Sequence, residues 1–219
     1  MSRLLVRLLL LAALLTGLLL LLLPPDPDAA RPLLPWQVQA DGRGGSTVFG
    51  IELGVTPLAR AAAGLGGEPK LTLFRRPDGT LVLEAFLDDL QPRGLKADFV
   101  LVLELPAAEL EALYARGLRT QRGTAGVRRV QLDPVDLPRA RAAAVASVTY
   151  LPRTDLDAAV LERRFGPPAR RVREAAEAVT HWLYPQLGLD IAVREEGREV
   201  LQYVAPREFA RLTAPLPAG

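Results

Sequence analysis

A leucine-rich segment near the amino terminus constrains this chain more than any other feature of the sequence. From position 4 to position 23, every residue except Arg7, Thr16 and Gly17 is Leu, Val or Ala. A helix of about 20 such residues is about 30 Å long, which matches the thickness of the hydrocarbon core of a bilayer. The sequence therefore predicts a transmembrane helix over residues 4–23, through which the chain contacts a membrane.

The charges that flank this segment predict its orientation. Arg3 and Arg7 lie at its start and two aspartates follow it, and basic residues stay on the cytoplasmic side of a membrane. The apolar run is longer than the apolar region of a signal peptide, which has about 7–15 residues. Only Ala29-Ala30 offers a cleavage site after it. We therefore predict an uncleaved signal anchor over residues 1–23, with a cleaved signal peptide as the alternative. The expected location is the bacterial inner membrane, single-pass, with the carboxyl-terminal domain in the periplasm.

The composition excludes several classes of function. There is no Cys, which rules out a lipidated cysteine, disulfide bonds, thiolate catalysis and the usual structural zinc sites. A formal charge of +2 and an aromatic content of 5% do not favour binding of nucleic acid through a basic patch or stacked bases. We expect no nucleic acid partner, no metal and no cofactor.

The first half of the exported part predicts an α+β module. Residues 24–47 are rich in Pro and Gly and are expected to form a stalk and a loop. An Ala-rich helix is predicted over residues 58–65. Two alternating segments, residues 70–75 and 81–87, flank the turn at Pro77-Asp78-Gly79 and predict a β-hairpin. A further strand, a short helix and a polar loop over residues 118–126 are predicted to follow the hairpin. Together these elements make up a first module at residues 48–133.

The second half predicts a second module of the same kind, over residues 144–212. Thr154 precedes a predicted helix that ends at Gly166, and residues 170–179 are expected to be helical or irregular. Strands are predicted at residues 181–184, 187–194 and 198–204. Because both halves place a helix before antiparallel strands, the sequence suggests an internal duplication. The predicted fold class is α+β, with an N-terminal transmembrane helix followed by two helix-plus-antiparallel-sheet modules.

Short motifs in the second half resemble a known family of envelope modules. Phe165-Gly166-Pro167-Pro168 closes the helix, Trp182-Leu183-Tyr184-Pro185 opens the sheet, and Gly197-Arg198-Glu199-Val200 precedes Tyr203-Val204. Residues 147–206 thus resemble the SmpA/OmlA family, and a tandem pair would also resemble the β-lactamase inhibitory proteins. The resemblance implies a helix packed on a three-stranded antiparallel sheet and a role in protein interaction. The chain departs from the family by lacking the cysteine that carries its lipid.

The residues available for catalysis are few. His181 is the only histidine, and Ser46 and Ser147 are the candidate hydroxyl nucleophiles; neither lies in a Gly-x-Ser-x-Gly turn. Residues 42–47 are Gly-rich but lack the Gly-Lys-Ser/Thr end of a phosphate-binding loop. We therefore expect His181 to be a structural residue and the chain not to be an enzyme.

Clusters of charge are interpreted as solvated surface. The acidic pairs Asp88-Asp89 and Glu195-Glu196 consist of neighbours, which point to opposite faces of a strand, and Asp133 and Asp136 lack a calcium-loop pattern. The densest basic cluster comprises Arg163, Arg164, Arg170, Arg171 and Arg173. It is expected to be a solvated helix face, with anionic lipid or an acidic partner as the alternatives.

The resulting functional hypothesis is a non-enzymatic periplasmic protein that binds an envelope protein partner in cell-envelope assembly or maintenance. Trp182, Tyr184 and Tyr203 are the predicted contact residues, because aromatic side chains are frequent at binding hot spots; burial in the core is the alternative for them. A carrier of lipid or another hydrophobic ligand would need a cavity of roughly 300 Å³ between sheet and helices. A hydrolase would need His181 in a cleft beside a carboxylate and a hydroxyl.

Overall fold

The computed structural model describes residues 33–217. The predicted stretch of membrane helix, residues 4–23, and the anchor at residues 1–23 lie outside this range. Within residues 33–217, no helix combines the length and the apolar character needed to cross a bilayer.

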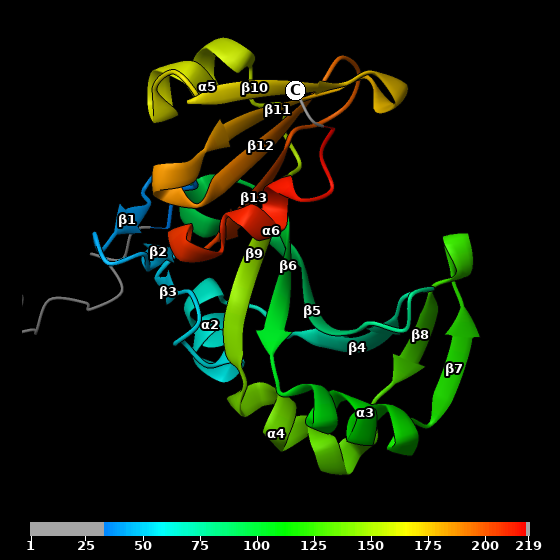
Figure 1. Ribbon diagram of the computed structural model, residues 1–219. Helices are drawn as coiled ribbons and strands as arrows, with labels where there is room; N and C mark the ends of the chain where they lie inside the picture. Colours follow the sequence, from blue (N-terminus) through cyan, green and yellow to red (C-terminus); the bar gives the residue numbers. More distant parts are fainter. Residues whose placement is uncertain (1–32, 218–219) are drawn as a thin grey trace, which may run out of the picture. The chain divides into compact units, whose positions relative to one another are not determined.

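One antiparallel sheet of ten strands dominates the described part of the chain (Figure 1). Its strands, in spatial order, are β10 (Arg170–Glu174), β11 (Val179–Tyr184), β12 (Leu189–Arg194), β13 (Val200–Val204), β9 (Ala144–Pro152), β6 (Ala97–Glu104), β5 (Leu81–Leu90), β4 (Lys70–Arg75), β8 (Arg128–Gln131) and β7 (Arg119–Arg122). Strand β9 pairs with β6 on one side and with β13 on the other. Strands from both predicted modules, residues 48–133 and 144–212, therefore belong to one continuous sheet.

Short elements pack around this sheet. A three-stranded sheet consists of β1 (Gln39–Ala40), β2 (Ser46–Val48) and β3 (Ile51–Glu52), and the α-helices are α2 (Leu58–Leu65), α3 (Ala107–Arg116), α4 (Leu137–Ala142), α5 (Ala158–Phe165) and α6 (Ala210–Thr213). The longest of these described helices, α3, has 10 residues. Helices this short are marginal on their own and depend on packing against the sheet.

The predicted fold class is therefore wrong. We expected α+β, with a transmembrane helix followed by two helix-plus-antiparallel-sheet modules, whereas residues 33–217 are mostly antiparallel sheet with few helices, none able to span a membrane. Two segments account for much of the difference. Residues 170–174, predicted to be helical or irregular, form β10, and residues 119–122, predicted as loop, form β7. Both lie at sheet edges and carry exposed arginines, so neither shows the apolar alternation by which a strand is recognised.

The core lies on one face of the large sheet. In β5, Leu83, Ala85 and Leu87 are fully buried, while the residues between them point to the other face and are half-buried. Burying each such Leu side chain contributes about 1.5–3 kcal/mol to folding. This alternation, repeated in β6 with Phe99 and Leu101, fixes which side of the sheet is packed and which remains open.

A turn of the small sheet carries an aromatic side chain into this core. Phe49 and Gly50 connect β2 to β3 with φ angles of 52° and 72°, the left-handed pair that a two-residue type I′ hairpin requires. The Phe49 ring lies 5.0 Å from that of Phe99, 5.2 Å from that of Tyr150 and 5.8 Å from that of Tyr203. These aromatic contacts join the small sheet to β6, β9 and β13.

Candidate functional site

The side of the large sheet opposite the core is the candidate functional site, and we call it the open face. Its half-buried side chains come from β4, β5, β6, β9 and β13: Thr72, Phe74, Val82, Glu84, Phe86, Val100, Val102, Ser147, Thr149 and Gln202. Half of these side chains are apolar or aromatic, and they come from β4, β5 and β6. A sheet face that stays apolar without a covering layer is typical of an interaction surface.

Two adjoining hollows mark the open face. The larger has a volume of about 560 Å³ and extends from β5 and β6 across β9 and β13 to Arg211 and Leu212 at α6. The second, of about 410 Å³, lies over β4, where Phe74 and Phe86 contribute to its wall. Both hollows are lined by Val100 and by Glu84. They therefore form one shallow groove that crosses five strands.

Glu84 is the acidic side chain at the junction of these hollows. Its carboxyl group is half-buried among Phe86, Val100 and Val102. Burial raises the pKa of Glu84, because the charged form loses solvation, and the nearby Arg76 partly opposes this shift. An apolar ligand that covered the groove would strengthen the desolvation, so binding and protonation of Glu84 are expected to favour each other.

Arginines line one end of the open face. Arg119 and Arg129 lie near the hollow between β7, β8 and β4, and the Arg129 guanidinium lies 5.9 Å from the centroid of the Phe74 ring. Within residues 33–217, neither arginine forms an ion pair with a carboxylate. The groove thus has an apolar middle and a positively charged end.

His181 lies in a cluster of carboxylates at the opposite end of the sheet. Its Nδ1 is 2.8 Å from Asp190 Oδ2 and its Nε2 is 3.4 Å from Glu174 Oε2, and the Asp190 side chain is 1% exposed. Burial raises the pKa of Asp190, against the opposing effect of His181. No hydroxyl group of the described residues hydrogen-bonds His181. The cluster has the carboxylate but not the nucleophile that the hydrolase hypothesis needs, and its hydrogen bond joins β11 to β12.

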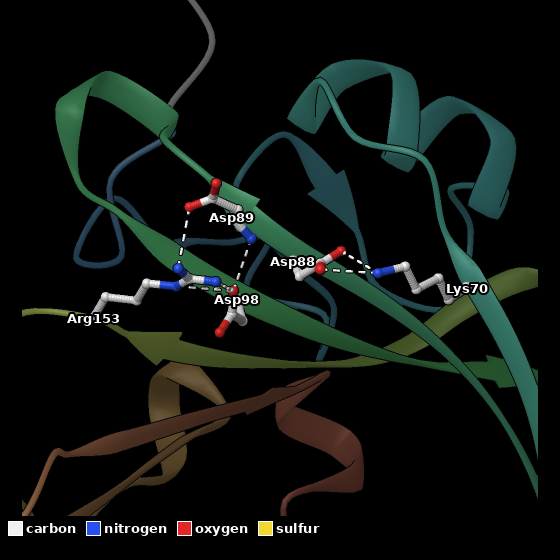
Figure 2. A network of polar contacts seen from close by, with 5 residues as sticks. All are labelled: Lys70, Asp88, Asp89, Asp98 and Arg153. Atoms are coloured by element: carbon white, nitrogen blue, oxygen red, sulfur yellow. Dashed lines mark hydrogen bonds and ion pairs between the residues drawn. The ribbon is translucent and has the colours of Figure 1, made fainter.

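The predicted acidic pair Asp88-Asp89 belongs to a polar network near the end of β5 (Figure 2). Lys70 Nζ lies 2.9 Å from Asp88 Oδ2, and Arg153 bonds both Asp89 (3.2 Å) and Asp98 (2.8 Å). The backbone N–H of Asp89, a residue with φ of 55°, donates to Asp98 Oδ1 over 2.8 Å. These bonds hold the irregular pairing between β5 and β6. The network therefore stabilises the irregular segment of β5, and each of its carboxylates already has a cationic partner.

The three predicted contact residues lie in the core. Trp182 is 7% exposed, Tyr184 is 3% exposed and Tyr203 is fully buried. The Tyr184 hydroxyl donates to the carbonyl oxygen of Gly166, and the Tyr203 hydroxyl donates to that of Pro35, each over 2.9 Å. Their hydroxyl groups therefore fix neighbouring loops, and their rings present little area to a partner. Their role in binding a partner stays a prediction. The open face exposes more of its side chains than these three residues do.

The remaining predicted features have local structural roles. Asp41 Oδ1 accepts the backbone N–H groups of Arg43 and Gly45, which fixes the glycine-rich loop. Ser46 is buried, whereas Ser147 lies on the open face. Asp133 caps the turn at Val135, and Asp136 accepts from Arg116 over 2.7 Å. In residues 33–217, no group of three or more His, Cys, Asp or Glu side chains could hold a metal ion.

Sequence reasoning missed the open face because its signal is ambiguous. Val82, Glu84 and Phe86 alternate with fully buried residues of β5, but from Leu81 to Leu87 every side chain of this strand except that of Glu84 is apolar. A strand with apolar residues on both faces is expected to be buried on both faces. The structure has few helices to cover the second face of the sheet, and Phe86 and Val100 are therefore left half-buried. The sequence of β5 alone does not show this.

Comparison with known proteins adds no relative: no family model, curated protein or solved structure matches this chain. The resemblance to the SmpA/OmlA family therefore stays a prediction.

Proposed function

We propose that this chain is a non-enzymatic protein-binding module whose open face binds a polypeptide segment that is both apolar and acidic. The observation that carries the proposal is the continuous groove over β4, β5, β6, β9 and β13, walled by half-buried aromatic and aliphatic side chains. Covering Phe74, Phe86 and Val100 would remove apolar area from water at a gain of about 25 cal/mol per Å².

The charges around the groove specify the acidic character of the partner. Arg119 and Arg129 lie at its β7–β8 end without a carboxylate partner among the described residues. Glu84, at the junction of the two hollows, has a raised pKa, and Glu104 also lines the larger hollow. A segment with carboxylates at one end and apolar side chains along its length would complement this distribution. Charge complementarity of this kind favours one partner over another and accelerates association.

A carrier of lipid or another hydrophobic ligand is the second candidate. The hollow of about 560 Å³ exceeds the volume of roughly 300 Å³ expected of a ligand site. It is open, however, and Ser147, Thr149 and Gln202 contribute polar groups to it. An acyl chain would leave these groups without hydrogen bonds, at a cost of about 1–3 kcal/mol each, whereas a polypeptide can bond them. This difference favours the protein partner.

Peptide binding tests the proposal directly. Three labelled peptides are compared, in which Phe alternates with Glu, Phe alternates with Lys, or Ser alternates with Glu. Fluorescence anisotropy measures the affinity of each peptide for the full chain. We expect the Phe/Glu peptide to bind more tightly than the other two. Val100→Glu places a carboxylate at the junction of the two hollows and is expected to weaken this binding about tenfold or more, through lost apolar contact and like-charge repulsion.

Val55→Glu is the matched control, because Val55 is a valine that is 58% exposed and does not line the groove. It should leave the affinity unchanged, and circular dichroism should show that both variants are folded. Equal binding of the Phe/Lys peptide would overturn the acidic partner, and unchanged binding by Val100→Glu would overturn the site. Binding of a fatty acid probe, sensitive to Val100→Glu and with no peptide binding, would establish the carrier instead. The predicted role in the cell envelope rests on the amino-terminal segment and the family resemblance, which residues 33–217 do not test.

A further inference from the structure

A row of three arginines crosses three adjacent strands at one edge of the sheet. Arg75 of β4 lies directly opposite Arg128 of β8, and Arg128 lies directly opposite Arg122 of β7. Residues paired in this way share a face of the sheet, here the side opposite the open face, where Leu73 and Val130 are buried. With neighbouring strands about 4.8 Å apart, the three backbone positions span about 10 Å.

Nothing in the described part of the chain neutralises this row. Residues 117–132 contain four arginines and no Asp or Glu, and none of the three arginines forms an ion pair within residues 33–217. The nearby Asp78 is committed elsewhere, since its Oδ1 accepts the backbone N–H of Thr80 over 2.9 Å. Like charges placed directly opposite one another destabilise a sheet, and no carboxylate within residues 33–217 offsets this repulsion by an ion pair with the row.

Tyr114 of α3 holds one member of the row in place. The Arg75 guanidinium lies over the Tyr114 ring, 4.7 Å from its centroid. Stacking uses the face of the guanidinium, and its N–H groups donate in the plane. Hydrogen bonds from Arg75 and Arg128 lower the pKa of the Tyr114 hydroxyl, and the positive charges of the two arginines add to this shift. The row is therefore ordered by stacking rather than by a carboxylate.

A pocket adjoins the row between two turns. It has a volume of about 380 Å³ and is lined by Arg75, Arg76, Pro77, Gly79, Gly126 and Arg128. The β4–β5 turn and the β7–β8 turn approach closely here, because a Cβ on Gly126 would lie 3.4 Å from Pro77 Cγ. Three of its six lining residues are arginines and none is acidic. Its walls can donate many hydrogen bonds and accept few.

We propose that this pocket and the adjoining arginine row bind the phosphate groups of a ligand that carries at least two negative charges. Guanidinium groups bond phosphate through two parallel N–H donors, and a row about 10 Å long accommodates two linked phosphates side by side. The arginine row lies on the other face of the sheet from Arg119 and Arg129, and the pocket shares only Arg76 with the lining of the larger hollow on the open face. Phosphate is the shared chemistry of a soluble phosphate ester and of a lipid headgroup.

Isothermal titration calorimetry of the full chain with inorganic pyrophosphate tests this site, with sulfate at equal ionic strength as the comparison anion. We expect pyrophosphate to bind more tightly than sulfate, and Arg122→Gln to weaken its binding about tenfold or more, the usual effect of removing a bidentate charged hydrogen bond. Arg122→Lys keeps the charge but loses the paired N–H donors of the guanidinium. Its affinity for pyrophosphate should lie between those of the wild type and of Arg122→Gln. Arg173→Gln is the matched control, because Arg173 lies on the edge strand at the other end of the sheet and is paired with Glu195; it should leave pyrophosphate binding unchanged.

A second arm identifies the source of the phosphate. Vesicles of phosphatidylglycerol and of phosphatidylcholine are compared for binding of the full chain and of its Arg122→Gln variant. A loss of phosphatidylglycerol binding in the variant, greater than any loss with phosphatidylcholine, supports a lipid headgroup, and pyrophosphate binding without that loss supports a soluble ligand. Absence of both, or equal sensitivity of pyrophosphate binding to Arg173→Gln and Arg122→Gln, would overturn the site. Because the peptide assay depends on Val100 and this one on Arg122, either proposal can fail alone.

Discussion

The ten-stranded sheet runs from β10 at one end to β7 at the other (Figure 1), and the arginines of the two ends differ in their partners. At the β10–β11 end, two of the three arginines of β10 are paired: Arg171 bonds Glu162 over 3.2 Å while lying over the Trp182 ring, and Arg173 bonds Glu195 over 2.6 Å. At the β7–β8 end, the four arginines of residues 117–132 meet no carboxylate of the described residues. We call these the paired end and the unpaired end.

Edge protection explains part of this pattern but not all of it. A charged side chain on an edge strand prevents pairing with another chain, which accounts for Arg171 and Arg173 on β10 and for Arg122 on β7. It does not account for Arg128 and Arg75, because β8 and β4 each have neighbours on both sides. Like charges that continue inward from the edge are expected where a ligand supplies the missing negative charge. The comparison thus separates arginines that complete the fold from arginines that are free to bind.

The largest effect is expected from the side chain that supports the paired end. Trp182→Ala removes a ring that is 7% exposed and on which the Arg171 guanidinium rests 4.4 Å from the centroid. We expect a loss of about 3–5 kcal/mol in the free energy of unfolding, measured by chemical denaturation. Phe74→Ala is the control at the unpaired end, where the ring is half-buried beneath Arg129. An equal loss in both variants would show that the two ends are packed alike.

A smaller, pH-dependent effect is expected at the His181 cluster. With Asp190 ionised, His181 Nδ1–H donates to its Oδ2 over 2.8 Å, so His181→Ala leaves a buried carboxylate without this donor. We expect a loss of about 1.5–3 kcal/mol at neutral pH. Because burial raises the pKa of Asp190, the stability that the carboxyl group contributes is present below its ordinary pKa of 3.8 and decreases as the pH rises through the raised value.

Unfolding curves over a range of pH check both parts of this prediction. The difference between the wild type and His181→Ala should be smallest in acid, where Asp190 is protonated, and should increase as the pH rises. Asp190→Asn removes the titrating group, so the wild type should lose stability relative to this variant as the pH rises from 3.8. A difference that does not change with pH would show that Asp190 does not titrate in this range.

The sequence predicted the elements whose signals are local. The helix at residues 58–65 and the strand at residues 70–75 have the predicted bounds, since the first ends at Gly66 and the second leads to Pro77-Asp78-Gly79. The assembly of the strands could not be predicted in the same way, because the pairing of β9 with both β6 and β13 joins residues far apart in the chain.

The candidate sites were hidden for a similar reason. The basic composition of residues 117–132 is visible in the sequence, but the row of Arg75, Arg128 and Arg122 exists only through the register of β4, β8 and β7. The aromatic residues Trp182 and Tyr203 looked like contact residues because composition alone does not distinguish a buried ring from an exposed one. In the structure the Phe49 ring packs against Tyr203, and Phe165 of α5 packs against Tyr184, the third predicted contact residue.

The smallest effect tests the comparison through its sign. Arg173→Gln breaks an exposed ion pair with Glu195, whose side chains are 63% and 59% exposed, and should lower the free energy of unfolding by at most about 1 kcal/mol. Arg122→Gln removes a positive charge that lies opposite Arg128. In ligand-free protein it should therefore raise the free energy of unfolding, by roughly a few tenths of a kcal/mol. Both changes should shrink in about 1 M salt, where the screening length falls to about 3 Å. If Arg122→Gln instead lowers stability as much as Arg173→Gln does, Arg122 has an internal partner and the unpaired end is held together in the same way as the paired one.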